Sequence, residues 1–292
     1  MRHESLEDIL ARRADEPVPP EVAAMANAVR ASFGTGVMAV LSYGSSLRGV
    51  DPAETLIDLY VLTDSLSDVS SNPVSRAACA LLPPNVYYAE TVFEGRTLRS
   101  KYAVLPLAAF ERRCGGMTDN PYFWARFSQP CRLVHVHDRM TRVRVVQSLG
   151  EAVRTMLTAA AGVAPMEVDA AALWVAGFRE TYRTELRPEG PDRAAGIVKA
   201  DEAYYRALAD AAAPILPERA ADWRLRRLIG KALSVLRLLK AAFTFAGGAD
   251  YLAWKIGRHS GERIELKPWQ RRHPILGALS LLPGLLRRGA VR

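Results

Sequence analysis

Two short apolar runs with a glycine-serine loop between them constrain this chain more than any other feature. VMAVLSY at 37–43 and LIDLYVLT at 56–63 have the length and the β-branched and aromatic content of buried strands. The first run ends at Gly44, which can adopt backbone conformations that other residues rarely reach. The second run alternates enough to expose Asp58 on one face. We therefore predict two neighbouring strands joined by a loop.

The rest of the chain predicts a mixed domain followed by helices. The predicted helices and strands are helices at 5–13 and 20–33, a hairpin of 86–93 and 98–106, helices near 107–113 and 121–127, a strand near 131–137, and helices at 141–160, 167–176, 191–213 and 222–245. We expect an α+β fold in three parts. A mixed-sheet domain at 1–140 precedes a helical domain at 141–220 and a C-terminal amphipathic segment at 221–292.

Composition excludes some classes of protein and points to an anionic partner. The 292 residues are 49% hydrophobic, which suffices for a sizeable core. Three cysteines, Cys79, Cys114 and Cys131, have no metal-like spacing and favour neither a zinc site nor a disulfide framework. Residues 221–292 hold 15 Lys and Arg against 4 Asp and Glu, so the net charge of +8 belongs to this segment. Lipid or nucleic acid are the partners that such a charge attracts.

The residues around the first loop indicate phosphate chemistry. Gly44 allows close approach of a phosphate, and Ser45 with the following N–H groups can donate to phosphate oxygens. Asp58 on the adjacent strand can hold Mg²⁺ against the same phosphates. A strand ending in Gly-Ser and a neighbouring strand with an outward aspartate form the pattern of the nucleotidyltransferase fold. The plainer alternative is a tight Gly-Ser turn beside a solvated aspartate.

One part of that pattern is missing. The fold usually carries a second carboxylate two residues after the first, and here Tyr60 stands there. Glu90 on a third strand is a candidate second metal ligand, and Glu54 and Asp64 lie near Asp58 in sequence. A single carboxylate suffices more easily when the nucleophile is a phosphate monoester, because such a group is already ionised at pH 7 and needs no general base.

Several landmarks in order make the chain similar to the mitochondrial CDP-diacylglycerol synthases, also called translocator assembly and maintenance proteins, and their bacterial relatives. The landmarks are YGSSLRG with Ser46 in place of a second glycine, LIDLYVLTD with Asp58 and Asp64, the pair Tyr87-Tyr88, the run Lys101-Tyr102-Ala103-Val104, and Ala125-Arg126-Phe127 followed by Gln129-Pro130. They span roughly residues 35–210. The corresponding strand of the family also carries a single aspartate, which agrees with Tyr60 in place of a second carboxylate here. The segment after Asp64 departs from the family's pattern.

The resemblance implies a nucleotidyltransferase domain, a winged-helix-like second domain and a C-terminal helix at the membrane, with CTP and Mg²⁺ as ligands. The resemblance implies that Asp58 and Asp64 bind the metal and that the positive charge of Lys101 stabilises a phosphate. The nucleotide-binding residues that it implies are Gly44, Ser45, Ser46, Tyr102, Arg183 and Arg187. The reaction would be transfer of CMP from CTP to phosphatidate, which forms CDP-diacylglycerol and releases pyrophosphate.

The C-terminal segment has the character of an interfacial helix. At 224–245 an apolar stripe that includes Leu228 and Leu236 is bordered by cations such as Arg226 and Arg237. The run at 273–288 is apolar, broken by Pro283 and too short to span a bilayer. We expect contact with an anionic membrane surface. Packing on the body of the protein is the alternative for 224–245. No nucleic-acid motif is present, and the aromatics are not interleaved with the basic residues, so we expect no nucleic-acid partner.

The leading hypothesis is therefore a CTP:phosphatidate cytidylyltransferase. No run reaches the ~18 apolar residues of a spanning helix, and the N-terminal residues lack the apolar core of a signal peptide. We expect a cytoplasmic protein associated peripherally with the inner face of the cell membrane. Two alternatives remain: a nucleotidyltransferase with another lipid-phosphate or small-molecule acceptor, and a non-catalytic nucleotide- or lipid-binding membrane adaptor. Nothing in the residues themselves selects the base of the nucleotide.

Overall fold

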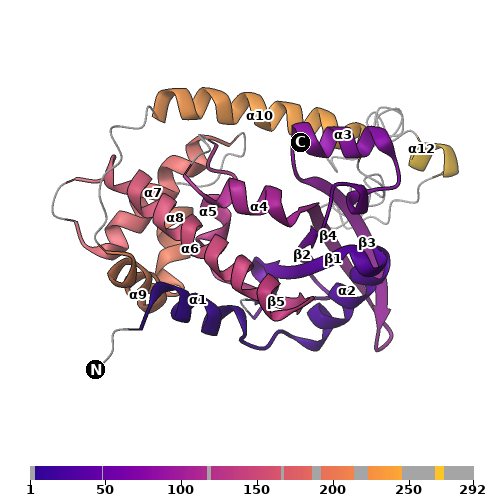
Figure 1. The fold of residues 1–292 in the computed structure, drawn as a ribbon, viewed down its shortest axis with the longest axis horizontal. Helices are drawn as coiled ribbons and strands as arrows, with labels where there is room; N and C mark the ends of the chain where they lie inside the picture. Colours follow the sequence, from indigo (N-terminus) through magenta and orange to yellow (C-terminus); the bar gives the residue numbers. More distant parts are fainter. Residues whose placement is uncertain are drawn as a thin grey trace, which may run out of the picture.

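A mixed five-stranded sheet occupies one side of the molecule, and a group of helices occupies the other (Figure 1). The computed structural model describes residues 4–47, 49–116, 120–165, 168–185, 192–213, 223–244 and 267–272. The strands are β1 (Val37–Tyr43), β2 (Leu56–Thr63), β3 (Asn85–Phe93), β4 (Arg96–Pro106) and β5 (Cys131–Val136). The helices are α1 (Leu6–Ala14), α2 (Pro20–Ala31), α3 (Pro73–Leu81), α4 (Leu107–Cys114), α5 (Trp124–Phe127), α6 (Arg139–Ala161), α7 (Ala170–Arg183), α8 (Arg193–Lys199), α9 (Glu202–Ala212), α10 (Trp223–Thr244) and α12 (Pro268–Arg272). The α+β class is confirmed.

The sheet has the strand order β3-β4-β2-β1-β5. β1 pairs antiparallel with β2 and β5, β3 pairs antiparallel with β4, and only β2 and β4 run parallel among these strands. β3 and β4 are joined at Glu94-Gly95, where both residues have positive φ, as a tight hairpin turn requires. The two predicted central strands have their predicted bounds, and they lie side by side at the middle of the sheet.

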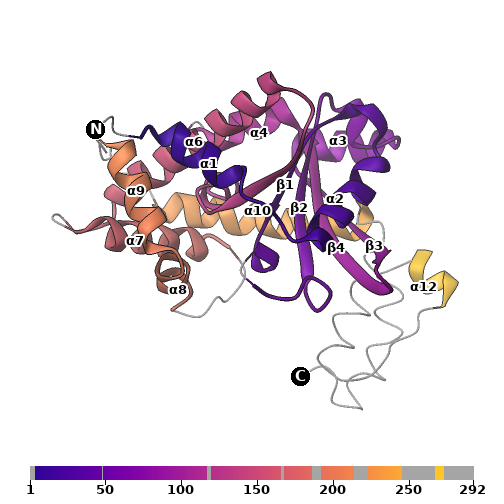
Figure 2. The same ribbon diagram turned by 90° about the horizontal axis from the view of Figure 1, so that it is seen from below.

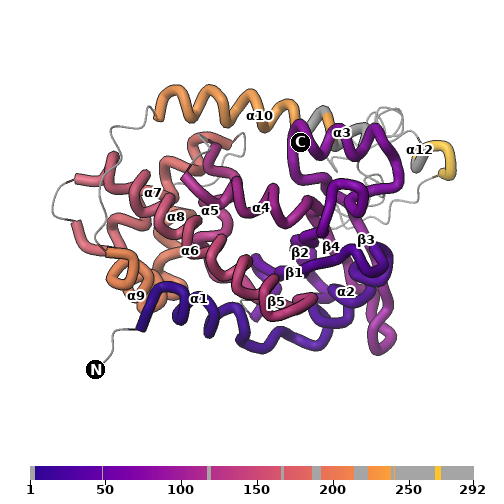
Figure 3. The backbone as a smooth tube through the Cα atoms, in the orientation of Figure 1, coloured from indigo at the N-terminus to yellow at the C-terminus, as the bar shows by residue number. Residues whose placement is uncertain are grey.

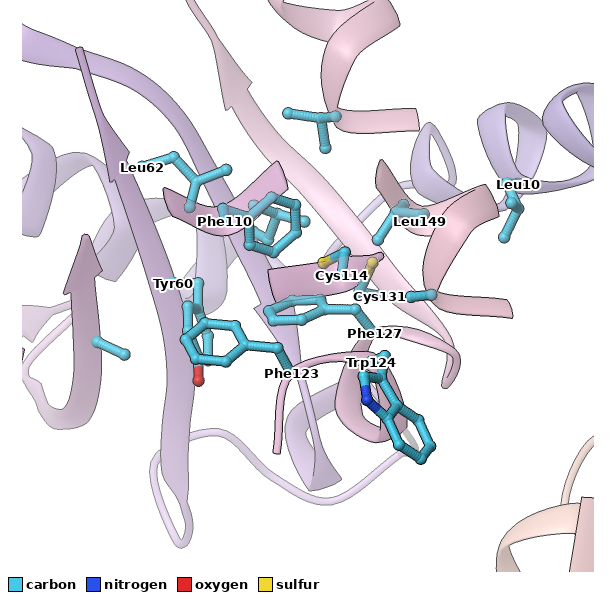
Figure 4. Close-up of a cluster of buried hydrophobic side chains, with 14 of the residues drawn as sticks. Leu10, Tyr60, Leu62, Phe110, Cys114, Phe123, Trp124, Phe127, Cys131 and Leu149 are labelled. Atoms are coloured by element: carbon cyan, nitrogen blue, oxygen red, sulfur yellow. The ribbon is translucent and has the colours of Figure 1, made fainter. Parts of the chain in front are cut away.

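The main core lies between one face of this sheet and the helices α4, α5 and α6 (Figure 4). Tyr60 and Leu62 point from β2 toward Phe110, Phe123 and Phe127. The Tyr60 ring lies 4.8 Å from the Phe127 ring, edge to face, and the tyrosine is 1% exposed. Tyr60, which stands where the sequence pattern led us to look for a second carboxylate, therefore belongs to an aromatic cluster. Helix α2 covers the opposite face and contacts all five strands.

The helices after the sheet are joined to it by the same core. Trp174 of α7 stacks on Phe178, and its indole N–H donates to the Tyr205 carbonyl of α9 at 2.8 Å. Helix α1 lies against α6 and α9 (Figures 2 and 3), so the first helix of the chain packs with the helical part. The described residues after β5 form helices and connections but no strand.

Three predicted helix boundaries were wrong. The helix predicted at 191–213 is two helices, because Asp201 leaves the helical conformation and pairs with Arg13. The helix predicted at 121–127 begins at Trp124, since the Asn120 side chain accepts from the Tyr122 N–H and holds a turn before it. The helix predicted at 167–176 runs from Ala170 to Arg183, with Asp169 as its N-cap.

Helix α10 crosses the molecule from the helical side to the sheet and passes beside α3 (Figure 1). Three of its cations, Arg226, Arg237 and Lys240, face the body, whereas Arg224 and Lys231 are exposed. Arg226 is 4% exposed and lies over the rings of Trp124 and Trp223. The Lys240 ammonium donates to the carbonyls of Leu82 and Pro84 at 2.5 and 2.6 Å. Packing on the body, the alternative for this helix, is what the structure shows for its cationic face.

The outer face of α10 carries apolar residues together with the exposed cations Arg224 and Lys231. Its exposed large hydrophobic residues are Leu225, Leu228, Val235 and Leu236, with exposed fractions of 49%, 69%, 45% and 50%. The predicted amphipathic helix therefore exists, but its apolar side points to solvent and several of its cations point inward. Among the described residues, no helix has both the length and the hydropathy to cross a bilayer. The predicted interfacial run at 273–288 lies outside the described residues.

Candidate functional site

A row of three residues crosses the sheet at the end of β1. Tyr43 is paired in register with Asp58, and Asp58 is paired with Lys101 on β4. Paired residues on adjacent strands share a face, so these three side chains project from the same side of the sheet. All three line a cleft of about 910 Å³ together with Gly44 and Ser45. The structure thus brings together the loop, the aspartate and the lysine that the sequence singled out.

The loop after β1 lies against the aspartate. Gly44 has a φ of +92°, and a Cβ at this position would lie 2.8 Å from Oδ2 of Asp58. Any side chain here would both strain the backbone and displace the carboxylate. The hydroxyl of Ser45 is hydrogen-bonded to that of Thr55 at 3.1 Å, which ties the start of the loop to its end. Ser46 is buried below the loop and does not line the cleft.

An arginine lies over the same end of β1. Arg126 from α5 lines the cleft with its guanidinium 4.9 Å from the Tyr43 ring centre and 5.6 Å from that of Tyr122. Cation–π contacts of this kind hold a guanidinium in one place. The Nε of Arg126 is buried and has no hydrogen-bond partner among the described residues. The cleft therefore contains the guanidinium of Arg126, held in place by two rings, with an Nε–H donor that has no partner among the described residues.

Tyr122 joins this arginine to two further cations. Its hydroxyl accepts from the Tyr60 hydroxyl at 3.5 Å. Burial alone would raise the pKa of Tyr122, but the nearby charges of Arg126, Arg237 and Lys101 lower it below its ordinary value. Burial raises the pKa of Tyr60 well above its ordinary value. Tyr122 is consequently a phenol held in a strongly positive part of the cleft.

The helical part of the chain forms the opposite wall. Tyr182 and Glu185 at the end of α7, Arg193 and Ile197 of α8, and Tyr205 of α9 line the cleft. Arg13 and Arg132 also line it, but each is paired with Glu16. The cleft therefore separates a wall of the sheet from a wall of helices, and both walls carry charged groups.

The residues fit a magnesium ion that arrives with a nucleotide. The described residues contain no group of three or more His, Cys, Asp or Glu side chains that could hold a metal alone. Mg²⁺ keeps several waters and commonly takes one or two protein carboxylates plus substrate phosphate oxygens. Asp58 beside the Gly44 backbone offers one carboxylate next to donors suited to phosphate. The donor set is thus sufficient for a metal-nucleotide complex, with the phosphates supplying the other ligands.

Two of the predicted metal ligands lie away from Asp58. Asp64 follows the far end of β2 and donates its backbone N–H to the Gly36 carbonyl at 3.0 Å. Asp64 is six residues further along the strand than Asp58, which corresponds to ~20 Å. Glu90 is on β3, where its carboxylate accepts from Arg99 at 3.2 Å and from the Tyr88 hydroxyl at 2.6 Å. Neither carboxylate lines the cleft.

Two predicted nucleotide-binding residues, Tyr102 and Arg183, do not line the cleft either. Tyr102 projects from the opposite face of β4, where its ring meets Phe33 and Tyr87. Arg183 is paired with Glu180 on its own helix and is not a lining residue. Arg187 lies outside the described residues. Strand alternation explains why Tyr102 is outside the cleft. Adjacent residues of a strand face opposite sides of the sheet, and Lys101 faces the cleft.

The sequence analysis assigned no role to four residues of the cleft: Tyr43, Tyr122, Arg126 and Glu185. Tyr43 could have been found, because it directly precedes Gly44 on the same strand. Tyr122 and Glu185 carry no such signal, since they are brought to the cleft by packing of α5 and α7.

Comparison of the chain with models of known protein families and with curated proteins finds no match. The function must therefore be argued from the site.

Proposed function

We propose that this protein is a nucleotidyltransferase that works at a membrane surface, and specifically a CTP:phosphatidate cytidylyltransferase. The observation that carries the proposal is the meeting of Gly44, Ser45, Asp58 and Lys101 in one cleft. CTP and phosphatidate as substrates come from the family resemblance. The nucleotidyltransferase fold and a winged-helix-like second domain belong to the same proposal.

In this reaction Gly44 and Ser45 hold the β- and γ-phosphates of the nucleotide by their N–H and hydroxyl groups. Asp58 would hold a Mg²⁺ ion, which would neutralise charge on the phosphates. A phosphate oxygen of the acceptor forms a bond to the α-phosphorus, the bond from that phosphorus to the bridging oxygen breaks, and pyrophosphate leaves with the electron pair. Lys101, next to Asp58 on the sheet, stabilises the charge of the reacting phosphates.

The outer face of α10 supports the membrane part of the proposal. A row of exposed leucines and a valine on a helix without any acidic residue suits insertion into an anionic lipid surface. Nearby, α3 exposes Val74 and Leu81, with exposed fractions of 72% and 83%. The carbonyl that follows Leu81 accepts from Lys240, so the end of α3 and α10 are in contact. Both helices can meet one membrane.

The experiment that tests the proposal measures pyrophosphate release. Purified protein is incubated with Mg²⁺, each of the four nucleoside triphosphates and phosphatidate in anionic vesicles. Asp58→Ala is assayed beside Asp210→Ala, which removes an exposed carboxylate of α9 outside the cleft. We expect release with CTP and phosphatidate only, lost in Asp58→Ala and retained in Asp210→Ala. No release with any nucleotide, although the protein binds the vesicles, would contradict the proposed activity.

A further inference from the structure

The order of the strands separates two sides of the cleft. The Gly44–Ser45 loop follows β1, Asp58 is on the next strand, and Lys101 is on the strand beyond. Neighbouring strands are about 4.8 Å apart, so Lys101 lies on the far side of Asp58 from the loop. In-line displacement requires the entering oxygen and the leaving oxygen to be on opposite sides of the phosphorus. If the loop holds the leaving pyrophosphate, the acceptor enters from the Lys101 side.

Three cations lie around Tyr122: Lys101 on that side of the cleft, Arg126 over the end of β1, and Arg237 on α10. Arg237 of α10 lies 4.1 Å from the ring centre and Arg126 lies 5.6 Å from it. Glu185 is the acidic group whose charge acts on both arginines. Within the described part of the chain, three cations and one carboxylate give this cluster an excess of positive charge.

The arginines also carry unused donors. Nε of Arg126, and Nε and Nη2 of Arg237, are buried without hydrogen-bond partners in the described part of the chain. Leaving buried donors unpaired costs free energy, so such donors are typical of groups that are completed by a ligand. A phosphate monoester carries a charge of about −1.5 to −2 at pH 7 and several acceptor oxygens. It would match the charge of this cluster and the unused donor of Arg126, the arginine that lines the cleft.

Building on the proposed nucleotidyl transfer, we propose that Lys101, Tyr122 and Arg126 form the subsite for the phosphate of the acceptor, and that Arg237 is a positioning residue behind Tyr122. Arg237 does not line the cleft, but it brings α10 into contact with the ring that does. Val86 of β3 lines the cleft on the same side, and α10 packs on β3. The remainder of the acceptor would thus extend toward the helix whose outer face carries exposed apolar residues.

The subsite is tested by measuring the KM for phosphatidate and the KM for CTP independently. A short-chain, water-soluble phosphatidate is varied at saturating MgCTP, and MgCTP is varied at saturating phosphatidate. Arg126→Gln removes charge-assisted hydrogen bonds to the acceptor, so we expect its KM for phosphatidate to rise about 10- to 100-fold. The KM for CTP should stay within about twofold, and Arg126→Lys should recover part of the loss. Arg112→Gln, which removes an exposed cation of α4 outside this cleft, is the matched control.

Arg237→Gln should raise the KM for phosphatidate less than Arg126→Gln does. The double variant should show less than the product of the two effects, because both residues act through Tyr122. Thermal unfolding of every variant checks that the fold is intact. An equal rise in the KM for CTP and for phosphatidate would assign Arg126 to the nucleotide and overturn the subsite. Unchanged Michaelis constants in a folded Arg126→Gln would also overturn it.

A binding measurement keeps this test independent of the proposed activity. Glycerol 3-phosphate carries the same phosphate monoester without acyl chains. Calorimetric titration of the wild type in the absence of nucleotide should show binding that Arg126→Gln loses and Arg112→Gln keeps. If the wild type releases no pyrophosphate but binds glycerol 3-phosphate in this way, the proposed reaction fails while the anion subsite stands. If short-chain phosphatidate and glycerol 3-phosphate both fail to bind the wild type, the subsite itself is wrong.

Discussion

The position of the Asp58 carboxylate depends on its neighbour in space, Gly44. The backbone of Gly44 occupies the space next to Oδ2, and its positive φ turns the chain away from β1 at that point. A metal-binding carboxylate must keep its position to within a fraction of an ångström, because small displacements in an active site are costly. In the proposed reaction Gly44 therefore has two roles, close approach to a phosphate and correct placement of Asp58.

We predict that Gly44→Ala reduces nucleotidyl transfer by about 100-fold or more, because the added Cβ displaces Asp58. Gly49→Ala is the matched control, since Gly49 also has a positive φ of 75° but open space around its Cβ. Both variants should lose about 1–2 kcal/mol of unfolding free energy from backbone strain. Only Gly44→Ala should lose activity. Equal activities for the two variants would refute the role of the contact with Asp58.

At the scale of elements, α10 is the part of the fold whose orientation matters most. Its inward face carries Arg226, Arg237 and Lys240, which find two aromatic clusters and the carbonyls after α3 as partners. Close approach to the helical part depends on Gly230, where a Cβ would lie 2.7 Å from the Thr184 carbonyl oxygen. The helix thus connects the helical wall of the cleft to the edge of the sheet.

We predict that Gly230→Ala destabilises the protein by about 1–3 kcal/mol, because overpacking against a backbone carbonyl must shift α10. Gly196→Ala in α8 is the control. No atom lies within 4 Å of the place that its added methyl would take, so alanine there should be neutral or stabilise by up to about 1 kcal/mol. Urea denaturation of both variants gives the comparison. Similar stabilities would mean that α10 is not packed as closely as Gly230 requires.

The outer face of α10 makes a separate prediction. Leu228→Glu combined with Leu236→Glu should weaken binding to anionic vesicles at least about tenfold, since it removes inserted apolar surface and adds repulsion from the lipid. Met140→Glu tests the same change at an exposed apolar residue of α6. Sedimentation with vesicles measures binding, and transfer to short-chain phosphatidate should be preserved in all variants. Unchanged vesicle binding in the double variant would show that another surface meets the membrane.

At the scale of the whole molecule, one buried cluster extends from α1 and the sheet to α9. Its cysteines, Cys79, Cys114 and Cys131, are all buried and free. Burial raises the pKa of Cys131 to about 12 and that of Cys114 well above its ordinary value. Because the thiolate is the reactive form, these thiols are protected both by burial and by protonation at neutral pH.

We therefore predict that iodoacetamide at pH 8 modifies none of the three cysteines in the native protein within a time that modifies all three in urea. Since the cysteines come from α3, α4 and β5 and share one buried cluster, protection of all three should be lost in one transition. Mass spectrometry of peptides from urea-treated samples measures each site. Labelling of Cys79 well before Cys131 would show that the edge of the sheet opens separately.

Local pattern in the sequence was enough to predict the central strands, the hairpin and the set of Gly44, Ser45 and Asp58. Alternation and loop chemistry act over a few residues, so they can be recognised without knowing what packs on each face. The same alternation could have shown that Lys101 and Tyr102 cannot both face the cleft. Asp64 and Glu90 were named because they are near Asp58 in sequence or on a neighbouring strand, and proximity of that kind does not place side chains together.

By itself, the sequence determined the α+β class, the loop that approaches Asp58 and the amphipathic character of α10. The tertiary structure alone decided that Arg126 and Tyr122 enter the cleft, that Glu185 faces them and that three of the cations of α10 point inward. The reason is physical. Secondary structure follows from neighbours along the chain, whereas the partner of a buried cation or ring is found among residues that are distant in sequence. Only the packed chain reveals which of those residues meet.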